Sequence, residues 1–116
     1  MQLMTTFNRG DVVLLPFPIS DTLSTKKRPA LILAMTSREG GLSEITIAQI
    51  TGHTGGPKLT GEHAIQNWQE AGLLRPSVVR LRLATVPTTA VFRKIGALAP
   101  RDLEPIGDGV KEMLGL

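Results

Sequence analysis

The chain has 116 residues, of which 41% are hydrophobic and 20% are charged. This length and composition are typical of a globular domain with a modest core, and they argue against a disordered chain. Because cysteine is absent, disulfides, thiolate metal sites and cysteine nucleophiles are excluded. The formal net charge of +3 is compatible with a polyanionic partner but does not establish one.

Neither a targeting signal nor a membrane span is evident in the sequence. Residues 1–8 contain no basic run followed by a long apolar segment, and no apolar stretch approaches the roughly 18 residues of a membrane span. We therefore expect residues 1–116 to form a single domain of a cytoplasmic protein that does not contact a membrane.

The first half of the chain predicts three β-strands. Residues 11–17 and 29–35 are apolar runs rich in valine, leucine and isoleucine, and residues 44–51 alternate between polar and apolar side chains. The polar segment 19–27 predicts a long loop between the first two strands. Gly40 and Gly41 predict a hairpin turn between the second and the third.

The middle of the chain is less regular. Residues 52–61 contain four glycines and a proline, which predicts a flexible loop. Residues 64–65 are a possible short strand. Residues 67–72 predict one or two helical turns, with Asn67 as N-cap and Gly72 as the stop. We interpret Trp68, the only tryptophan, as a packing anchor.

The last part of the chain predicts a strand and a helix. Residues 77–86 alternate, with Val79, Leu81 and Leu83 on one face and Arg80 and Arg82 side by side on the other. Residues 90–98 fit either a strand or a helix. From Pro100 onward, apolar residues recur at helical spacing, which predicts a helix with Asp102 as its N-cap and Pro105 in its first turn. Five or six short antiparallel strands with two helices indicate a small, barrel-like β fold.

The usual signatures of hydrolases and nucleotide-binding enzymes are missing from the sequence. His53 and His63 do not stand at metal-ligand spacing from another His, Asp or Glu, and there is no paired-carboxylate motif or nucleophile elbow. The glycines of residues 52–61 fit neither a Walker A motif nor a dinucleotide fingerprint. The basic residues are clustered: Lys26, Lys27 and Arg28 are consecutive, and residues 75–94 hold five more, so we expect a basic face.

Several short motifs follow one another in a fixed order. Gly10-Asp11 precedes the first apolar run, Arg28-Pro29 opens the second, and Thr51-Gly52 closes the third. Residues 68–77 read Trp-X-X-Ala-Gly-Leu-Leu-Arg-Pro-Ser. Together these motifs, which span nearly the whole chain, resemble those of the MazF/PemK toxin family, and residues 68–77 resemble its PemK-like branch.

The resemblance implies a mainly β protein with short helices: a small SH3-like antiparallel β-barrel with a C-terminal helix, as in MazF and CcdB. It implies the toxin component of a type II toxin–antitoxin system that inhibits growth by cutting RNA. The expected activity is that of a metal-independent, sequence-selective endoribonuclease (an mRNA interferase) that cleaves single-stranded RNA and needs no cofactor. It further implies a homodimer and a cognate antitoxin whose disordered acidic tail occupies the RNA groove.

By the same resemblance, Arg28 and Thr51 are the catalytic residues and flank the scissile phosphate. When a ribose 2′-hydroxyl attacks its own phosphate, negative charge builds on the non-bridging oxygens, and a guanidinium can meet two of them with parallel hydrogen bonds. Thr51 can orient the phosphate or the 2′-hydroxyl. Taken singly, Arg28 also fits a solvated surface charge, and Thr51 fits a β-branched residue that closes a strand.

The proton-transfer partner is open at this stage. In one branch of the family, the strand that aligns with residues 78–86 carries Arg-X-Asp; Arg80 matches that arginine, but Arg82 stands at the position of the aspartate. His53 is a candidate, because imidazole titrates near neutral pH, or it is an incidental loop residue. The residues expected to hold RNA are Ser24, Thr25, Lys26, Lys27, His53, Arg80 and Arg82.

Two other functions also fit parts of the sequence. The first is a non-enzymatic, gyrase-binding toxin of the CcdB type, which depends on a C-terminal Trp-Gly-Ile; this chain ends in Leu114-Gly115-Leu116. The second is a catalytically inactive RNA-binding barrel, for which a basic strand alone suffices.

Overall fold

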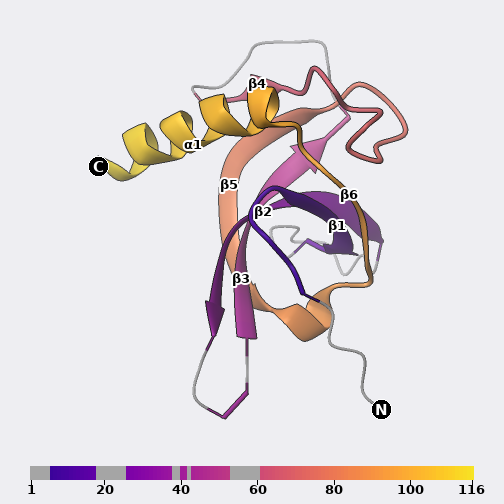
Figure 1. Ribbon diagram of the computed structural model, residues 1–116, viewed down its shortest axis with the longest axis vertical. Coiled ribbons are helices and arrows are strands. Elements are labelled where there is room, and N and C mark those ends of the chain that lie inside the picture. Colours follow the sequence, from indigo (N-terminus) through magenta and orange to yellow (C-terminus); the bar gives the residue numbers. More distant parts are fainter. Residues whose placement is uncertain (1–5, 18–25, 38–39, 42, 53–60) are drawn as a thin grey trace.

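The computed structural model describes residues 6–17, 26–37, 40–41, 43–52 and 61–116. Within these ranges, six strands form one antiparallel sheet in the order β4-β5-β3-β2-β1-β6 (Figure 1). The elements in chain order are β1 (Asp11–Pro16), β2 (Lys27–Ser37), β3 (Ser43–Thr51), β4 (His63–Ala64), β5 (Val78–Pro87), the 3-10 helix η1 (Thr88–Ala90), β6 (Arg93–Ala97) and α1 (Pro100–Leu114).

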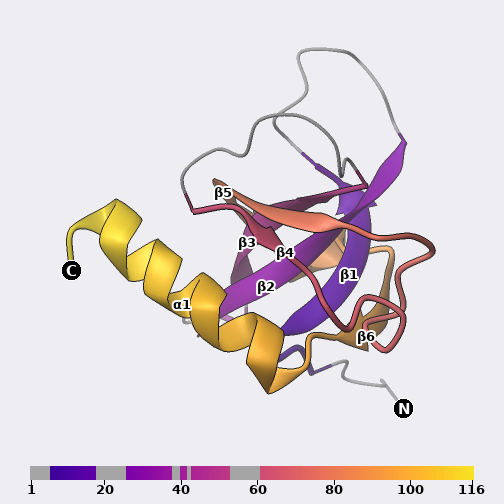
Figure 2. The ribbon, with the colours of Figure 1, turned by 90° about the horizontal axis from the view of Figure 1, so that it is seen from above.

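The sheet is curled, and α1 lies along one side of it (Figure 2). The two edge strands, β4 and β6, do not pair with each other, so the sheet is a half-barrel rather than a closed barrel. The predicted mainly β, antiparallel fold with a C-terminal helix is confirmed. No helix in the described ranges is long and apolar enough to span a bilayer.

The two faces of the sheet bury separate hydrophobic clusters. Neighbouring residues alternate between them, as the period of a strand requires: Val12 and Leu31 pack on the face covered by α1, whereas Val13 and Ile32 pack on the other. Trp68 packs against the cluster under α1, which confirms its predicted role as an anchor. Val79 of β5 belongs to the same cluster, and Leu81 and Leu83 pack against it, so these three residues share one face of β5, as predicted.

The strands predicted at residues 11–17, 29–35, 44–51 and 77–86 are all present, with ends that differ by a few residues. Gly40 and Gly41 have φ angles of +91° and +84° between the paired strands β2 and β3, so the predicted hairpin turn is confirmed. The segment 90–98, which fitted a strand or a helix, contains the end of η1 and then β6.

The start of α1 differs from the prediction. The helix begins at Pro100 and its N-cap is Ala99, which offers no side-chain cap. The assignment of Asp102 as N-cap was therefore wrong: Asp102 lies within the first turn, and Pro105 lies further inside the helix. The first position of the helix suits a proline such as Pro100, because an N–H at that position would have no partner within the helix.

Asp102 instead fastens α1 to the segment after β4. Its carboxylate is fully buried and accepts hydrogen bonds from the backbone N–H of Gln66 (2.8 Å) and of Asn67 (2.9 Å), and from Nε2 of His63 (2.9 Å). Burial alone would raise the pKa of Asp102, but the hydrogen bonds from Gln66, His63 and Asn67 outweigh it and hold the pKa below its ordinary value. The buried group is thus an ionised carboxylate whose partners come from a distant part of the chain.

Residues 67–72 form hydrogen-bonded turns and no continuous helix. The N–H of Ala71 donates to the carbonyl of Asn67 (3.2 Å), as in a single helical turn, but the next N–H, of Gly72, donates to the carbonyl of Gln69 (3.1 Å). The backbone N–H of Asn67 is bonded to Asp102, and its side chain donates to Glu70 (3.1 Å). Gly72 does end this segment as predicted: its φ is +82°, and the N–H of Leu73 reaches back to the carbonyl of Trp68 (3.1 Å).

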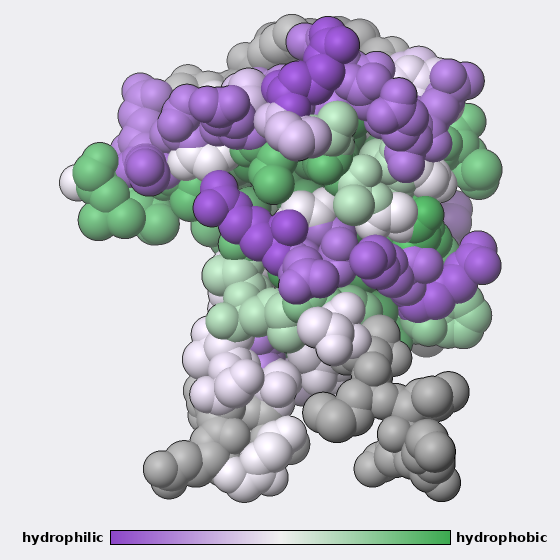
Figure 3. All heavy atoms as spheres, in the orientation of Figure 1, coloured by the Kyte–Doolittle hydropathy of each residue, from purple (hydrophilic) through white to green (hydrophobic). Residues whose placement is uncertain are grey.

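Exposed apolar side chains gather at the free end of α1, beyond the edge of the sheet (Figure 3). They belong to Met113, Leu114 and Leu116, which are 44%, 57% and 87% exposed.

Candidate functional site

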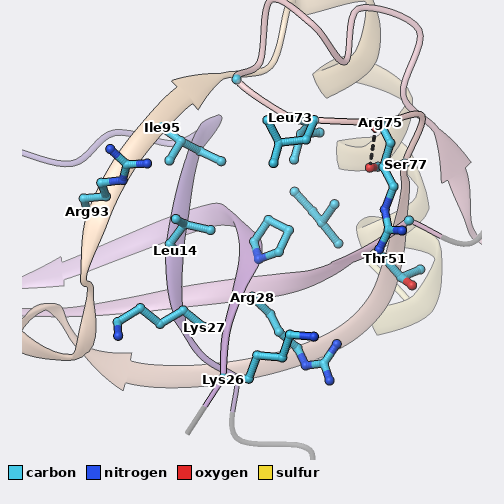
Figure 4. A pocket seen from close by; sticks show the side chains of 15 residues that line it. Leu14, Lys26, Lys27, Arg28, Thr51, Leu73, Arg75, Ser77, Arg93 and Ile95 are labelled. Carbon is cyan, nitrogen blue, oxygen red and sulfur yellow. Dashed lines mark hydrogen bonds between the residues drawn. The ribbon is translucent and has the colours of Figure 1, made fainter.

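A cavity of about 540 Å³ opens where one end of the sheet meets residues 72–77 (Figure 4). It lies on the face of the sheet that α1 covers elsewhere. The apolar lining comes from the strands and from residues 73–74, and Thr51 and Ser77 are the hydroxyl-bearing side chains. Five lining residues are basic: Lys26, Lys27, Arg28, Arg75 and Arg93. No lining residue in the described part of the chain is acidic, so the cavity is built to attract an anion.

Arg28 and Thr51 come from neighbouring strands. β2 and β3 pair antiparallel with Ala30 opposite Gln49, and this register, continued by two residues, places Arg28 opposite Thr51. Both residues line the cavity. Arg28 is exposed and Thr51 is half-buried, so a guanidinium and a hydroxyl are available to one ligand.

The floor of the cavity follows from the pairing of three strands. Leu14 of β1 lies between Pro29 of β2 and Arg93 of β6, and these three residues form a row across the sheet. Ile95, Ile50 and Leu73 extend the apolar floor. Figure 4 shows Arg93 and Lys27 on one side of this floor and Thr51, Arg28 and Arg75 on the other.

Arg75 reaches the cavity from the segment before β5. Its backbone carbonyl accepts a hydrogen bond from Oγ of Ser77 (2.9 Å), and Ser77 is buried. Its guanidinium lies so close to Gly52 that a Cβ at this glycine would overlap Nε and Cζ of Arg75. Since Gly52 directly follows Thr51, the guanidinium of Arg75 lies beside the end of β3, and Figure 4 shows it next to Thr51.

Two glycines hold the segment that carries Arg75 against β6. A Cβ at Gly72 would overlap the backbone carbonyl of Ile95, and a Cβ at Gly96 would overlap the carbonyl of Ala71. The two backbones therefore approach more closely than side chains would allow. This contact fixes residues 72–77 above the floor of the cavity.

An exposed aromatic ring lies beside the cavity. Phe92 is 60% exposed, and Nζ of Lys27 lies 4.4 Å from the centre of its ring. This is cation–π geometry, and the backbone N–H of Phe92 donates to the carbonyl of Leu14 (2.8 Å). The backbone of Phe92 is thus anchored to β1, and most of the ring is open to solvent beside Lys27 of the cavity.

Residues 8–114 match the family model described as PemK-like, MazF-like toxin of type II toxin-antitoxin system. The chain belongs to this toxin family. A comparison with curated proteins gives no match.

Solved structures of the family are similar over nearly their full length. The Mycobacterium tuberculosis toxin MazF-mt6 is 26% identical to this chain, with a TM-score of 0.67. The alignment covers 91% of this chain and 97% of the MazF-mt6 chain. An endoribonuclease from a mycobacterial species, in complex with its cognate antitoxin, is 17% identical, with coverages of 96% and 97% and a TM-score of 0.70. Another mycobacterial endoribonuclease is 16% identical, with coverages of 99% and 97% and a TM-score of 0.69. The last two likenesses concern the fold alone.

The cavity brings together four of the residues that the sequence of this toxin singled out. These are Arg28, Thr51, Lys26 and Lys27. Ser24, Thr25 and His53 lie outside the described residues.

Arg80 and Arg82 do not line the cavity. Arg82 is exposed on β5. Nε of Arg80 lies 3.0 Å from Oε1 of Glu62, an ion pair without hydrogen-bond geometry, and the two side chains are 24% and 6% exposed. The positive charge of Arg80 is therefore largely balanced within the fold.

Sequence reasoning missed Arg75, Arg93 and Phe92 as residues of the site. The cluster of basic residues between positions 75 and 94 was a signal, but it did not show which members share a cavity. The structure separates them: Arg75 and Arg93 line the cavity, whereas Arg80 pairs with Glu62 and Nζ of Lys94 lies 3.2 Å from Oδ1 of Asp11.

Proposed function

We propose that this toxin is an endoribonuclease that acts in the cytoplasm and cuts single-stranded RNA, with sequence preference and without a metal ion. The observation that carries the proposal is the cavity in which Arg28 and Thr51 meet four further basic residues and no acidic one among those described. Each nucleotide of RNA carries a negative phosphate, which basic side chains attract, and an unpaired base of single-stranded RNA can enter a cavity. A volume of about 540 Å³ suits a ligand of nucleotide size.

The proposed reaction is an internal transfer of the phosphate. The 2′-oxygen forms a bond to phosphorus while the bond from phosphorus to the 5′-oxygen of the next nucleotide breaks. The products are a 2′,3′-cyclic phosphate and a 5′-hydroxyl. The 2′-hydroxyl loses its proton, and the departing 5′-oxygen gains one.

Arg28 and Thr51 act on the charge that this reaction creates. In the transition state, the two non-bridging oxygens carry more negative charge than in the substrate, and a guanidinium binds both with charge-assisted hydrogen bonds. The hydroxyl of Thr51 donates to the phosphate or orients the attacking 2′-hydroxyl. Because no described lining residue is a carboxylate or an imidazole, these residues contribute by positioning and charge stabilisation.

The family membership and the surface also support two partners. A similar endoribonuclease has been solved in complex with its cognate antitoxin, and a cavity rich in cations would bind the acidic, disordered tail of an antitoxin. We propose a homodimer as well, because Met113, Leu114 and Leu116 expose apolar surface at the free end of α1. Sedimentation at several protein concentrations tests the dimer: a monomer at every concentration contradicts it.

The activity is tested by incubating purified protein with mixed-sequence RNA in excess EDTA, beside the variants Arg28→Ala and Lys111→Gln. Lys111 is exposed on α1 and does not line the cavity. Lys111→Gln therefore removes one positive charge, as Arg28→Ala does, but outside the cavity. We expect discrete fragments from the wild type and from Lys111→Gln, and a rate lower by roughly 10²–10³ for Arg28→Ala. RNA that is bound but stays intact would instead indicate an RNA-binding barrel without activity.

Growth provides an independent test of Thr51. Expression of the wild type without an antitoxin should arrest growth, and Thr51→Ala should relieve the arrest because the phosphate loses its hydroxyl contact. If Thr51→Ala arrests growth as strongly as the wild type at equal protein levels, Thr51 has no part in the site.

A further inference from the structure

We propose that Arg75 is a second catalytic arginine, which binds the scissile phosphate from the side opposite Arg28. The proposal rests on the proposed RNA cleavage, and it assigns to that reaction a residue from outside the strands that carry Arg28 and Thr51.

The sheet places the two arginines on either side of Thr51. β3 lies between β2 and β5 in the sheet. Arg28 belongs to β2, and the β2–β3 register, continued by two residues from the pair Ala30 and Gln49, places it opposite Thr51. On the other side, Thr51 pairs with Val78 of β5, and Arg75 precedes Val78 by three residues. A phosphate held at the hydroxyl of Thr51 would therefore have a guanidinium on each side.

Local contacts direct Arg75 toward this position. The guanidinium lies against Gly52, in the space that any other residue would fill with its Cβ. Pro76 disfavours the helical conformation at Arg75, and the hydroxyl of Ser77 donates a hydrogen bond of 2.9 Å to the Arg75 carbonyl. Leu73 and Ser77 are 8% and 5% exposed, so both neighbours of the Leu74–Pro76 segment are anchored while the arginine side chain is exposed.

The charge of Arg75 is available to a ligand. Two basic residues outside the cavity have acidic partners: Arg80 has Glu62 and Lys94 has Asp11. Neither Arg28 nor Arg75 has an ion-pair partner among the residues that the structure describes. An unpaired guanidinium kept in an open cavity is a ready site for a phosphate oxygen.

Two guanidiniums fit the reaction better than one. The pentacoordinate transition state carries nearly two negative charges, spread over its non-bridging oxygens. Each guanidinium can donate two parallel N–H groups, so both oxygens can be bound from both sides as charge develops. This arrangement stabilises the transition state more than the substrate, which carries a single negative charge.

The test compares Arg75→Gln, Arg75→Lys and Gly52→Ala with Lys111→Gln as the charge-matched control. For Arg75→Gln we expect kcat lower by roughly 10²-fold and weaker binding of a single-stranded DNA oligonucleotide, which has no 2′-hydroxyl and cannot be cut. Arg75→Lys should keep most of the binding but little of the rate, because an ammonium lacks the planar fork. Thermal unfolding of each variant checks that it folds.

Gly52→Ala tests the position of the guanidinium without removing its charge. Gly52 does not have a positive φ, so the backbone accepts alanine, and the new Cβ displaces the flexible end of Arg75. We expect kcat to fall as it does in Arg75→Gln. In the double variant Gly52→Ala/Arg75→Gln, the loss should equal that of Arg75→Gln alone, because both changes remove the same contact.

Three results overturn the proposal for Arg75 and leave RNA cleavage standing. They are a kcat for Arg75→Gln equal to that of Lys111→Gln, a kcat for Gly52→Ala equal to that of the wild type, and losses that multiply in the double variant. A wild type that cuts no RNA refutes the proposed function instead. In that case the DNA oligonucleotide still decides on Arg75: equal binding by the wild type and Arg75→Gln, or none by either, overturns its phosphate contact.

Discussion

The close approach of Gly72 to β6 should make this glycine one of the least replaceable residues of the fold. Gly72 has a φ of +82°, a conformation that costs other residues about 1–2 kcal/mol. In Gly72→Ala, the new Cβ would also overlap the backbone carbonyl of Ile95, which cannot rotate away as a side chain can. Forcing extra volume into a packed contact costs about 1–3 kcal/mol, so the sum is about 2–5 kcal/mol.

Gly40→Ala is the matched control, because it separates backbone strain from crowding. Gly40 has a φ of +91°, but a Cβ at this position would meet no atom of the described residues within 4 Å, apart from its own neighbours in the chain. Its substitution should therefore cost only the backbone part, about 1–2 kcal/mol. The difference between the two variants isolates the contact between residues 71–72 and β6.

Urea and thermal unfolding measure both variants. For a domain of this size, each kcal/mol lowers Tm by about 4 °C, so Gly72→Ala should lose about 8–20 °C and Gly40→Ala about 4–8 °C. The m-value should not change if both variants unfold in one step. Equal losses in the two variants would refute the reasoning, since they would mean that the contact with Ile95 adds nothing.

Two further predictions concern the buried carboxylate and the exposed ring. Asp102→Asn should lower the free energy of unfolding at pH 7 by about 1–3 kcal/mol. Because the folded-state pKa of Asp102 is lowered, its contribution is present above the ordinary carboxyl pKa and is lost as the pH falls through the folded-state value. Unfolding at a series of pH values should therefore show a shallower acid loss for the variant, and equal slopes contradict this. Phe92→Ala should weaken binding of single-stranded RNA by about 1–3 kcal/mol if a base stacks on the exposed ring, whereas Phe92→Trp should preserve it; titrations that show no difference between the two rule out stacking.

The strands were predictable because their signal is local. Alternation within residues 44–51 and 77–86 reflects which side chains face a core, and it is visible from neighbouring residues alone, without knowledge of distant contacts. Arg28 and Thr51 were singled out by the order of motifs, and the β2–β3 register explains why residues so far apart in the sequence share one cavity.

The remaining features depend on contacts between distant parts of the chain. Asp102 follows the local pattern of an N-cap, but its carboxylate accepts hydrogen bonds from backbone N–H groups 35 and 36 residues away, at Asn67 and Gln66. Arg75 belongs to the site because Gly72 lets its segment approach β6 and because Gly52 leaves space for its guanidinium. The motif at residues 68–77 contains both Gly72 and Arg75, but it does not show that they approach β6 and Gly52, and no period or motif links Asp102 to residues 66–67.

The most direct test of the central claim is the chemistry of the RNA ends. An oligonucleotide that the protein cuts in EDTA should yield a 2′,3′-cyclic phosphate on one fragment and a 5′-hydroxyl on the other, as resolved by mass spectrometry. Replacing the 2′-hydroxyl at the cut position with hydrogen should abolish cleavage, and Arg28→Ala should slow it without changing the ends. Fragments with 5′-phosphates, or cleavage that persists at the 2′-deoxy position, would contradict attack by the 2′-oxygen in the cavity of Arg28 and Thr51.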